Sequence, residues 1–163
     1  MVMNSNVLRP PAASDTEAIL ALSNANHIEV GRIERDALER LIRAAFHVRV
    51  AGHVDALLIG LEQGADYASP NYRWFAQRFD RFVYVDRVVV AEAARGAGLA
   101  RRLYDDFFAA ARGAGHTRVC CEVNYDPPNP ASDAFHARMG FEEIGRAHLP
   151  DRAKSVRYLL RAL

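Results

Sequence analysis

The residues best suited to chemistry form a glycine-containing loop after an apolar run. Val88, Val89 and Val90 lead into Arg95-Gly96-Ala97-Gly98-Leu99-Ala100-Arg101, after which apolar residues recur at helical spacing. This order predicts a strand, a tight loop and the start of a helix. The first amides of a helix lack partners within the helix and lie at the positive end of its dipole, so they suit an anion. Because glycine lets the backbone approach closely, the loop predicts a site for a phosphorylated ligand.

Two carboxylates in predicted strands are candidates for proton transfer. Asp86 precedes the valine run, and Glu122 lies in the next apolar segment. A carboxylate in a largely apolar strand is expected to have a raised pKa or a charged partner. Arg87 and Arg118 are the candidate partners, so each carboxylate is either a general base or half of a structural ion pair. Strand alternation groups Asp86 with Tyr84 and Val88, and Glu122 with Cys120 and Asn124.

Two segments of the chain resemble the GNAT superfamily, the acyl-CoA-dependent N-acyltransferases. Arg95-Gly96-Ala97-Gly98-Leu99-Ala100 fits the Arg/Gln-x-x-Gly-x-Gly/Ala loop of that family. Residues 129–141, Asn129-Pro130-Ala131-Ser132-Asp133-Ala134-Phe135-His136-Ala137-Arg138-Met139-Gly140-Phe141, resemble its second motif, in which an Asn is followed by a small residue, an aromatic and Gly-Phe. Each motif is short, but the two in this order are fairly specific. The resemblance covers the second half well, and the first half only in its order of elements.

The resemblance implies an α/β (α+β) fold, with a mixed central sheet of about six to seven strands and helices on both faces. It places acetyl-CoA, as co-substrate, in a gap between strands 82–90 and 117–124. The residues that it implies for cofactor binding are Val88, Val89, Val90, Arg95, Gly96, Ala97, Gly98, Leu99, Ala100, Arg101, Asn129, Phe135 and His136. Three of these have plain structural alternatives: Arg101 as a solvated helix arginine, Asn129 as a turn residue, and Phe135 as a core residue.

The implied reaction is direct attack of an amine on a thioester. A primary amine has a pKa of about 10.4, so it is mostly protonated at neutral pH and a base must take its proton. We expect Glu122 to be that base, with Asp86 second, although positioning of the two reactants is the alternative source of the rate. His136 stands where many family members have a Tyr acid; it is either an acid or a hydrogen-bonded helix histidine, and Tyr125 is the substitute.

The expected elements follow the order of that family. We predict strands at 6–9, 46–51, 54–62, 81–90, 117–123, 141–147 and 155–160, and helices at 15–24, 34–45, 99–112 and 132–139. Ser14 is the predicted N-cap of the first helix, in a capping box with Glu17. Residues 63–80 read as a long aromatic loop that either lines an acceptor pocket or forms an outer flap.

The length, charge balance and cysteine content of the chain argue against several classes of protein. The chain has 163 residues, which suits one domain over 1–163, and its 21 Lys+Arg against 20 Asp+Glu argue against a general nucleic-acid binder. Lys154 is the only lysine, which we interpret as compositional bias. The adjacent Cys120 and Cys121 are expected to face opposite sides of a strand, and no metal-ligand spacing occurs. The sequence shows no signal peptide and no membrane span, so a cytoplasmic protein is expected.

Several alternatives remain at this point. A dinucleotide-binding oxidoreductase is disfavoured, because Arg101 occupies the third glycine position of Gly-x-Gly-x-x-Gly. The sequence argues less strongly against a non-catalytic acyl-CoA sensor, because the residues expected to bind the cofactor differ from those expected to carry out the chemistry. The acceptor is expected to be a small-molecule or peptide amine. Dimerisation is common in the family, so a homodimer is left open.

Overall fold

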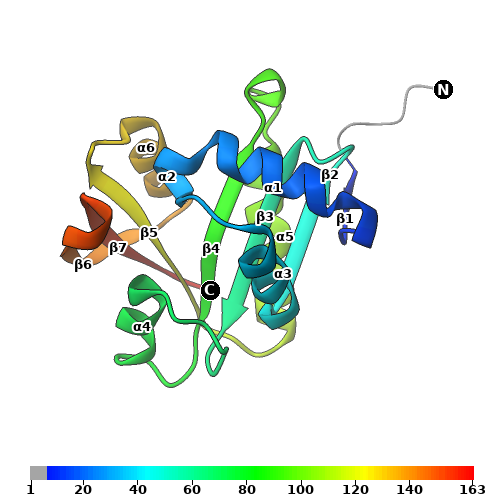
Figure 1. Cartoon of the computed structure of the whole chain (residues 1–163). Coiled ribbons are helices and arrows are strands. Elements are labelled where there is room, and N and C mark those ends of the chain that lie inside the picture. The colour runs from blue at the N-terminus through cyan, green and yellow to red at the C-terminus, as the bar shows by residue number, and fades with distance from the viewer. Residues whose placement is uncertain (1–6) are drawn as a thin grey trace.

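The computed structural model describes residues 7–163, in which seven strands form one mixed sheet with helices on both faces (Figure 1). The strand order is β1-β2-β3-β4-β5-β7-β6, and β4 and β5 are the parallel pair. The strands are β1 (Leu8–Arg9), β2 (His47–Ala51), β3 (Ala56–Glu62), β4 (Val83–Val90), β5 (Arg118–Asp126), β6 (Glu142–Leu149) and β7 (Lys154–Ala162). Asn6, which the sequence assigned to the first strand, lies outside the described residues.

The helices include two that the sequence analysis missed. The helices are α1 (Thr16–Ala25), α2 (His27–Val30), α3 (Arg35–Ala44), α4 (Pro70–Ala76), α5 (Leu99–Gly113) and α6 (Pro130–Arg138), with 3-10 turns at Ala13–Asp15, Glu92–Ala94 and Pro150–Arg152. The segment expected as a loop over 63–80 therefore contains α4. The Ser69 hydroxyl caps α4 by accepting a hydrogen bond from Tyr72 N at 3.5 Å, and Pro70 opens the helix.

The capping box predicted at Ser14 is wrong. The first helix begins at Thr16, and the carboxylate of Asp15 accepts a hydrogen bond from Ala12 N at 2.7 Å. The same carboxylate pairs with Arg9 at 2.6 Å. The Asp15 carboxylate therefore stabilises the 3-10 turn before α1, and α1 itself has no side-chain hydrogen bond at its N-cap.

Alternation along the central strands divides the core into two layers. One layer joins α1, α3 and α4 to the sheet, with Ile19, Leu38 and Phe75 fully or nearly fully buried in it. The other joins α5 to the opposite face. Cys120 belongs to the first layer and Cys121 to the second, so the prediction that they face opposite sides is confirmed, and both are free thiols. Burial of apolar side chains on both faces fixes the sheet between its helices.

None of the helices within residues 7–163 has the length and apolar character needed to cross a membrane.

Gly60 of β3 allows α5 to pack against the sheet, because a Cβ built there would overlap the ring of Phe107, with Cζ at 2.6 Å. We expect Gly60→Ala to lower the free energy of unfolding by about 2 kcal/mol through overpacking. Gly113→Ala, where a Cβ meets nothing within 4 Å, is the control and should leave stability unchanged or raise it by up to about 1 kcal/mol. Urea denaturation followed by circular dichroism measures both. Equal stability of Gly60→Ala and wild type would contradict this packing.

Candidate functional site

The site begins where β4 and β5 separate. The two strands pair in parallel only at Val83–Val119 and Tyr84–Cys120. Beyond these pairs the strands diverge, as Figure 1 shows. The gap that the sequence analysis placed between strands 82–90 and 117–124 is therefore present. On its β5 side, the main chain of β4 after Tyr84 has no strand partner among the described residues.

A β-bulge at Asp86 changes which face each following residue of β4 takes. Gly60 of β3 pairs with Val85 and Ile59 pairs with Arg87, so Asp86 is an extra residue. Val88 and Val90 consequently pack against the layer under α5, whereas Val89 joins the opposite layer. The predicted grouping of Val88 with Asp86 is wrong, because alternation alone cannot reveal a bulge.

The valine run is also less buried than its composition suggests. A run of three valines is typical of a strand buried on both faces, but Val88 and Val90 are only half-buried, whereas the strand's first residues, Val83–Val85, are buried. The cause is the divergence of β5, which leaves Val88 and Val90 facing a cavity. The apolar run forms the wall of a site as well as part of the core.

A cavity of about 1150 Å³ occupies the gap and extends to α2, α6 and the turn between β6 and β7. Its volume is slightly larger than that of a typical small-molecule site, roughly 300–1000 Å³. Of the residues expected to bind the cofactor, those that line it are Val88, Val89, Val90, Arg95, Gly96, Ala100, Asn129, Phe135 and His136. Of the catalytic candidates, those that line it are Asp86, Glu122 and His136.

Gly96 in the loop before α5 and Ala100 in the first turn of that helix line this cavity, whereas Gly98 lies outside its lining. Gly96 and Gly98 have φ of +86° and +75°, in the left-handed region that favours glycine, and a Cβ at either would meet nothing within 4 Å. The first main-chain bond of α5 runs from Arg102 N to Gly98 O at 3.1 Å, so the preceding amides have no partner within the helix. The backbone is open here and carries the positive end of the helix dipole.

The remaining residues of the loop lie differently. Ala97 and Leu99 border a smaller hollow beside the loop, and the Leu99 side chain is buried in the layer under α5. Arg101 lies 3.9 Å from Asp105, and both side chains are exposed to solvent, which matches its structural alternative. Arg95 donates to Asn26 Oδ1 at 3.1 Å and so links the loop to the end of α1.

Glu122 sits in the cavity wall with two neutral donors. Tyr84 Oη donates to its Oε2 at 2.7 Å, and Asn71 Nδ2 donates to its Oε1 at 3.0 Å. Tyr158 Oη in turn donates to Asn71 Oδ1 at 2.9 Å. Burial raises the pKa of Glu122 to about 7, against the smaller stabilisation of the carboxylate by the Tyr84 bond. The predicted partner Arg118 is not in contact: its guanidinium donates to Arg81 O.

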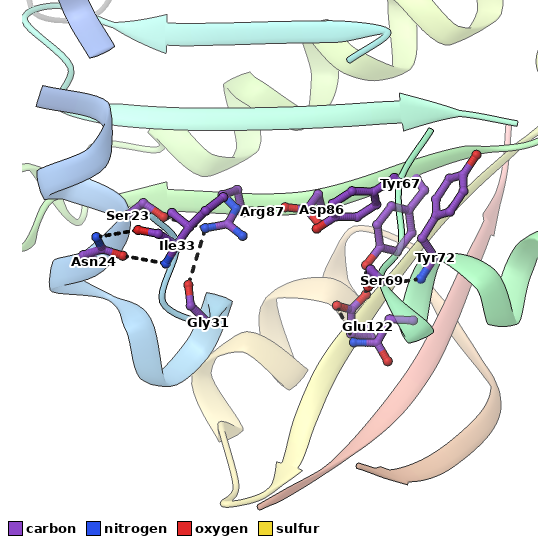
Figure 2. A network of polar contacts seen from close by, with 12 residues as sticks. Ser23, Asn24, Gly31, Ile33, Tyr67, Ser69, Tyr72, Asp86, Arg87 and Glu122 are labelled. Atoms are coloured by element: carbon purple, nitrogen blue, oxygen red, sulfur yellow. Dashed lines mark hydrogen bonds and ion pairs between the residues drawn. The ribbon is translucent and has the colours of Figure 1, made fainter. Parts of the chain in front are cut away.

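Asp86, by contrast, is paired as the structural alternative predicted. Its Oδ2 accepts from Arg87 Nε at 2.8 Å, and its Oδ1 accepts from the hydroxyl of Tyr67 (Figure 2). Arg87 also donates to Ser23 Oγ at 2.6 Å. The Asp86 and Arg87 side chains are 5% and 6% exposed, so this is a buried ion pair anchored to α1.

His136 is held on the other face of the sheet with both ring nitrogens occupied. Its Nδ1 lies 2.8 Å from Ser132 O, so that nitrogen carries the proton and donates. Its Nε2, 2.7 Å from Tyr104 Oη, must then accept. Burial lowers the pKa of His136, so the ring is neutral at pH 7. This geometry favours the hydrogen-bonded helix histidine over the acid.

The other residues of the second motif differ in what they offer. Asn129 is the N-cap of α6, where its Oδ1 accepts from Ser132 N at 3.3 Å, while its Nδ2 has no partner among the described residues and borders the cavity. Phe135 lines the cavity and packs at 5.7 Å from the Tyr104 ring. Tyr125 does not line it, because the Arg146 guanidinium covers its ring at 4.9 Å.

Residues 63–80 contribute to the site through the segment before α4 and through one residue of α4, Asn71. Tyr67 and Ser69 line the cavity, and Asn71 binds Glu122, but Trp74 stacks on Tyr158 at 4.2 Å and lies outside the cavity lining. The sequence analysis missed Asn71 as a site residue. The Ser69-Pro70 cap signal could have placed a helix here, but no local pattern could show that it reaches β5. Among residues 7–163, no group of three or more His, Cys, Asp or Glu could hold a metal ion.

Comparisons with solved structures show the same fold. The chain is 17% identical to Ard1 from Thermoplasma volcanium, with 98% of this chain and 99% of that chain covered and a TM-score of 0.76. It is 23% identical to the ribosomal-protein-alanine N-acetyltransferase from Brucella melitensis, covering 96% and 99%, with a TM-score of 0.69. For yncA from Salmonella typhimurium, whose structure contains its cofactor acetyl-CoA, identity is 19%, coverage 96% and 92%, and the TM-score 0.71.

Two comparisons of the sequence gave different results. No curated protein sequence matches the chain. The profile of the acetyltransferase (GNAT) family matches residues 29–141, which span α2 to the start of β6 and include the gap, the loop before α5 and the second motif. The chain belongs to the GNAT acetyltransferase family.

Proposed function

We propose that this protein transfers an acetyl group from acetyl-CoA to the amine of a small-molecule or peptide acceptor, by direct attack of the amine on the thioester. One observation carries the proposal. A carboxylate with a pKa raised to about 7, Glu122, and the free amides at the start of α5 open onto the same cavity. An anionic cofactor and a proton acceptor therefore share one space.

The residues present fit coenzyme A. The amides at the start of α5 and the cavity-facing Arg95 would hold its phosphates, with Arg138 of α6 as a further cation on the wall. The unpaired edge of β4 at Val88–Val90 offers main-chain groups to its amide-bearing arm, as a neighbouring strand would. The free Nδ2 of Asn129 is a further donor. When bound, acetyl-CoA supplies the activated acetyl group.

Glu122 is suited to take the proton of the amine. The carboxylate of an ordinary Glu has a pKa near 4.3 and is a poor match for this task, whereas a pKa of about 7 lies close to neutral pH. The two side chains that hydrogen-bond to its carboxylate, Tyr84 and Asn71, are neutral donors. Asp86 already accepts hydrogen bonds from Arg87 and Tyr67, so its carboxylate is less available to the amine than that of Glu122.

The candidate base and the residues of the second motif lie on opposite faces of the sheet. Glu122, Asp86 and Asn124 lie on the face covered by α1, α2 and α4, whereas His136 and Tyr104 lie under α5 and α6. The amine would approach from the first face and the cofactor from the second, meeting in the gap. With Nε2 accepting from Tyr104, we assign His136 the positioning of α6 against α5, and no proton transfer to the leaving thiolate.

Replacement of Gly96 tests the cofactor site. We expect Gly96→Trp to weaken acetyl-CoA binding by roughly 100-fold or more, about 3 kcal/mol, because the side chain would fill the loop that borders the cavity. Gly64→Trp is the matched control, since Gly64 also has a positive φ of +80° and open space around it but lies outside the cavity lining. Isothermal titration calorimetry measures both. Wild-type affinity in Gly96→Trp would refute this cofactor site.

Replacement of Glu122 separates catalysis from binding. We expect Glu122→Gln to retain acetyl-CoA affinity and to lose about 100-fold or more in kcat with any accepted amine, measured as thiol release. In wild type, kcat/KM should rise as the pH passes through about 7, because the base is active only when deprotonated. That inflection should vanish in Glu122→Gln, leaving the rise that reflects the amine itself. Binding without thiol release for any amine would instead support an acyl-CoA sensor.

The hydrogen bond from Tyr84 should set the pH at which kcat/KM rises. Its hydroxyl stabilises the ionised carboxylate, so Tyr84→Phe removes a hydrogen bond that lowers the pKa of Glu122. We expect the inflection in kcat/KM to move to higher pH in Tyr84→Phe. Tyr72→Phe, in the same aromatic cluster but bonded to Glu62 O at 2.6 Å, should leave it in place. A shift to lower pH, or equal shifts in both variants, would remove Tyr84 from this role.

A further inference from the structure

Two cations on the acceptor side of the cavity have no anionic partner. Lys154, the first residue of β7, and Arg152, in the turn before it, both line the cavity. Neither makes a side-chain hydrogen bond or ion pair with any of residues 7–163, whereas the more deeply placed Arg87 is paired with Asp86. Unpaired positive charge in a cavity wall is available to a ligand.

Strand alternation places Lys154 on the same face of the sheet as Val156, which packs in the layer under α1, α3 and α4. Glu122, Asp86, Arg87 and Arg152 line the same cavity as Lys154. Burial and the two neighbouring arginines lower the pKa of Lys154, while the two carboxylates raise it. Asp86 is neutralised by Arg87, and Glu122 is needed to accept a proton. Neither carboxylate is therefore a permanent partner for Lys154.

The segments that border the acceptor side of the cavity are held in place by hydrogen bonds. Asn124 of β5 is buried, and its Nδ2 donates to the main-chain oxygen of Ile28 in α2 at 3.1 Å. This bond ties α2 across to β5, and Figure 1 shows α2 beside the end of β5 from which α6 begins. Tyr67 is tied to Asp86 on the neighbouring strand. An acceptor that reaches Glu122 therefore enters between fixed segments.

We infer that the acceptor is a small molecule of the amino-acid class, with its primary amine facing Glu122 and a nearby carboxylate, or an equivalent anionic group, held by Lys154 and Arg152. The inference rests on the proposed function and narrows its substrate. A peptide is disfavoured as the acceptor, because the α-carboxylate of its N-terminal residue has become part of a neutral peptide bond. The sequence analysis interpreted the single lysine as compositional bias, but its position in the cavity wall gives its charge a use in binding an anionic group.

Matched amines test this assignment. Thiol release from acetyl-CoA is measured with a set of L-amino acids, with the corresponding L-amino acid amides, with the corresponding amines that lack the carboxylate, and with short peptides. Rates are compared at equal concentrations of the unprotonated amine, and release without any amine is subtracted. We expect kcat/KM for the best amino acid to exceed that of its amide and its decarboxylated amine by at least about tenfold, equivalent to about 1.4 kcal/mol.

Substitution of Lys154 shows whether that preference depends on its charge. We expect Lys154→Met to lower the ratio of kcat/KM for the amino acid to kcat/KM for its amide at least about tenfold, and to leave the affinity for acetyl-CoA unchanged. Both substrates are measured well above pH 7, where Glu122 is deprotonated, because the charge of Lys154 also lowers the pKa of Glu122. Lys154→Arg, which keeps the charge, should retain most of the preference. Arg43→Met, at an exposed position of α3 outside the cavity, is the control for loss of a cation. Melting curves of all variants verify that each is folded.

Failure of this inference differs from failure of the proposed function. Equal turnover of acids, amides and decarboxylated amines, or a peptide as the best acceptor, would overturn the inference and leave acyl transfer intact. An acid preference that survives in Lys154→Met would also overturn it. Absence of thiol release with every amine, despite acetyl-CoA binding, would overturn the proposed function itself.

Discussion

The structure depends on the separation of two parallel strands in the middle of an otherwise continuous sheet. β4 is paired with β3 along its length, and β5 is paired with β7 from Arg118 to Asp126, but β4 and β5 meet only at Val83–Val119 and Tyr84–Cys120. Each strand is thus secured by its outer neighbour, and neither needs the other for its hydrogen bonds. Each core layer includes side chains from both halves of the sheet, so the packing of helices on its two faces holds the halves together across the gap.

Polar residues around the gap are supported by aromatic packing behind them. Glu122 is bound by Asn71, Asn71 is bound by Tyr158, and Tyr158 stacks on Trp74. The helix α4 therefore holds the position of a donor on the proposed base, although most of its aromatic side chains do not face the cavity. Both neutral donors stabilise the ionised carboxylate, so loss of either would raise the pKa of Glu122 further above the ordinary value.

Sequence reasoning succeeded where local patterns carry the structure. The loop from Arg95 to Ala100 and the helix after it follow from glycine positions and helical spacing, and the facing of Glu122 with Cys120 and Asn124 follows from strand alternation. The predictions from sequence were wrong or incomplete where the structure is set by a contact between distant residues or by an extra residue in a strand. The bulge at Asp86 reversed the facing of Val88, and the carboxylate of Asp15, rather than Ser14, stabilises the turn before α1. The contact of Asn71 with Glu122 joins α4 to β5, so no local window could contain it.

The most direct test of the account is a crystal structure of the protein with coenzyme A. The account predicts that the phosphates lie at the amides that open α5, that the pantetheine arm runs along the unpaired edge of β4 at Val88–Val90, and that the sulfur ends in the gap on the side from which Glu122 can be reached. Coenzyme A bound outside the gap, or strands β4 and β5 paired beyond Tyr84 with no room between them, would contradict it.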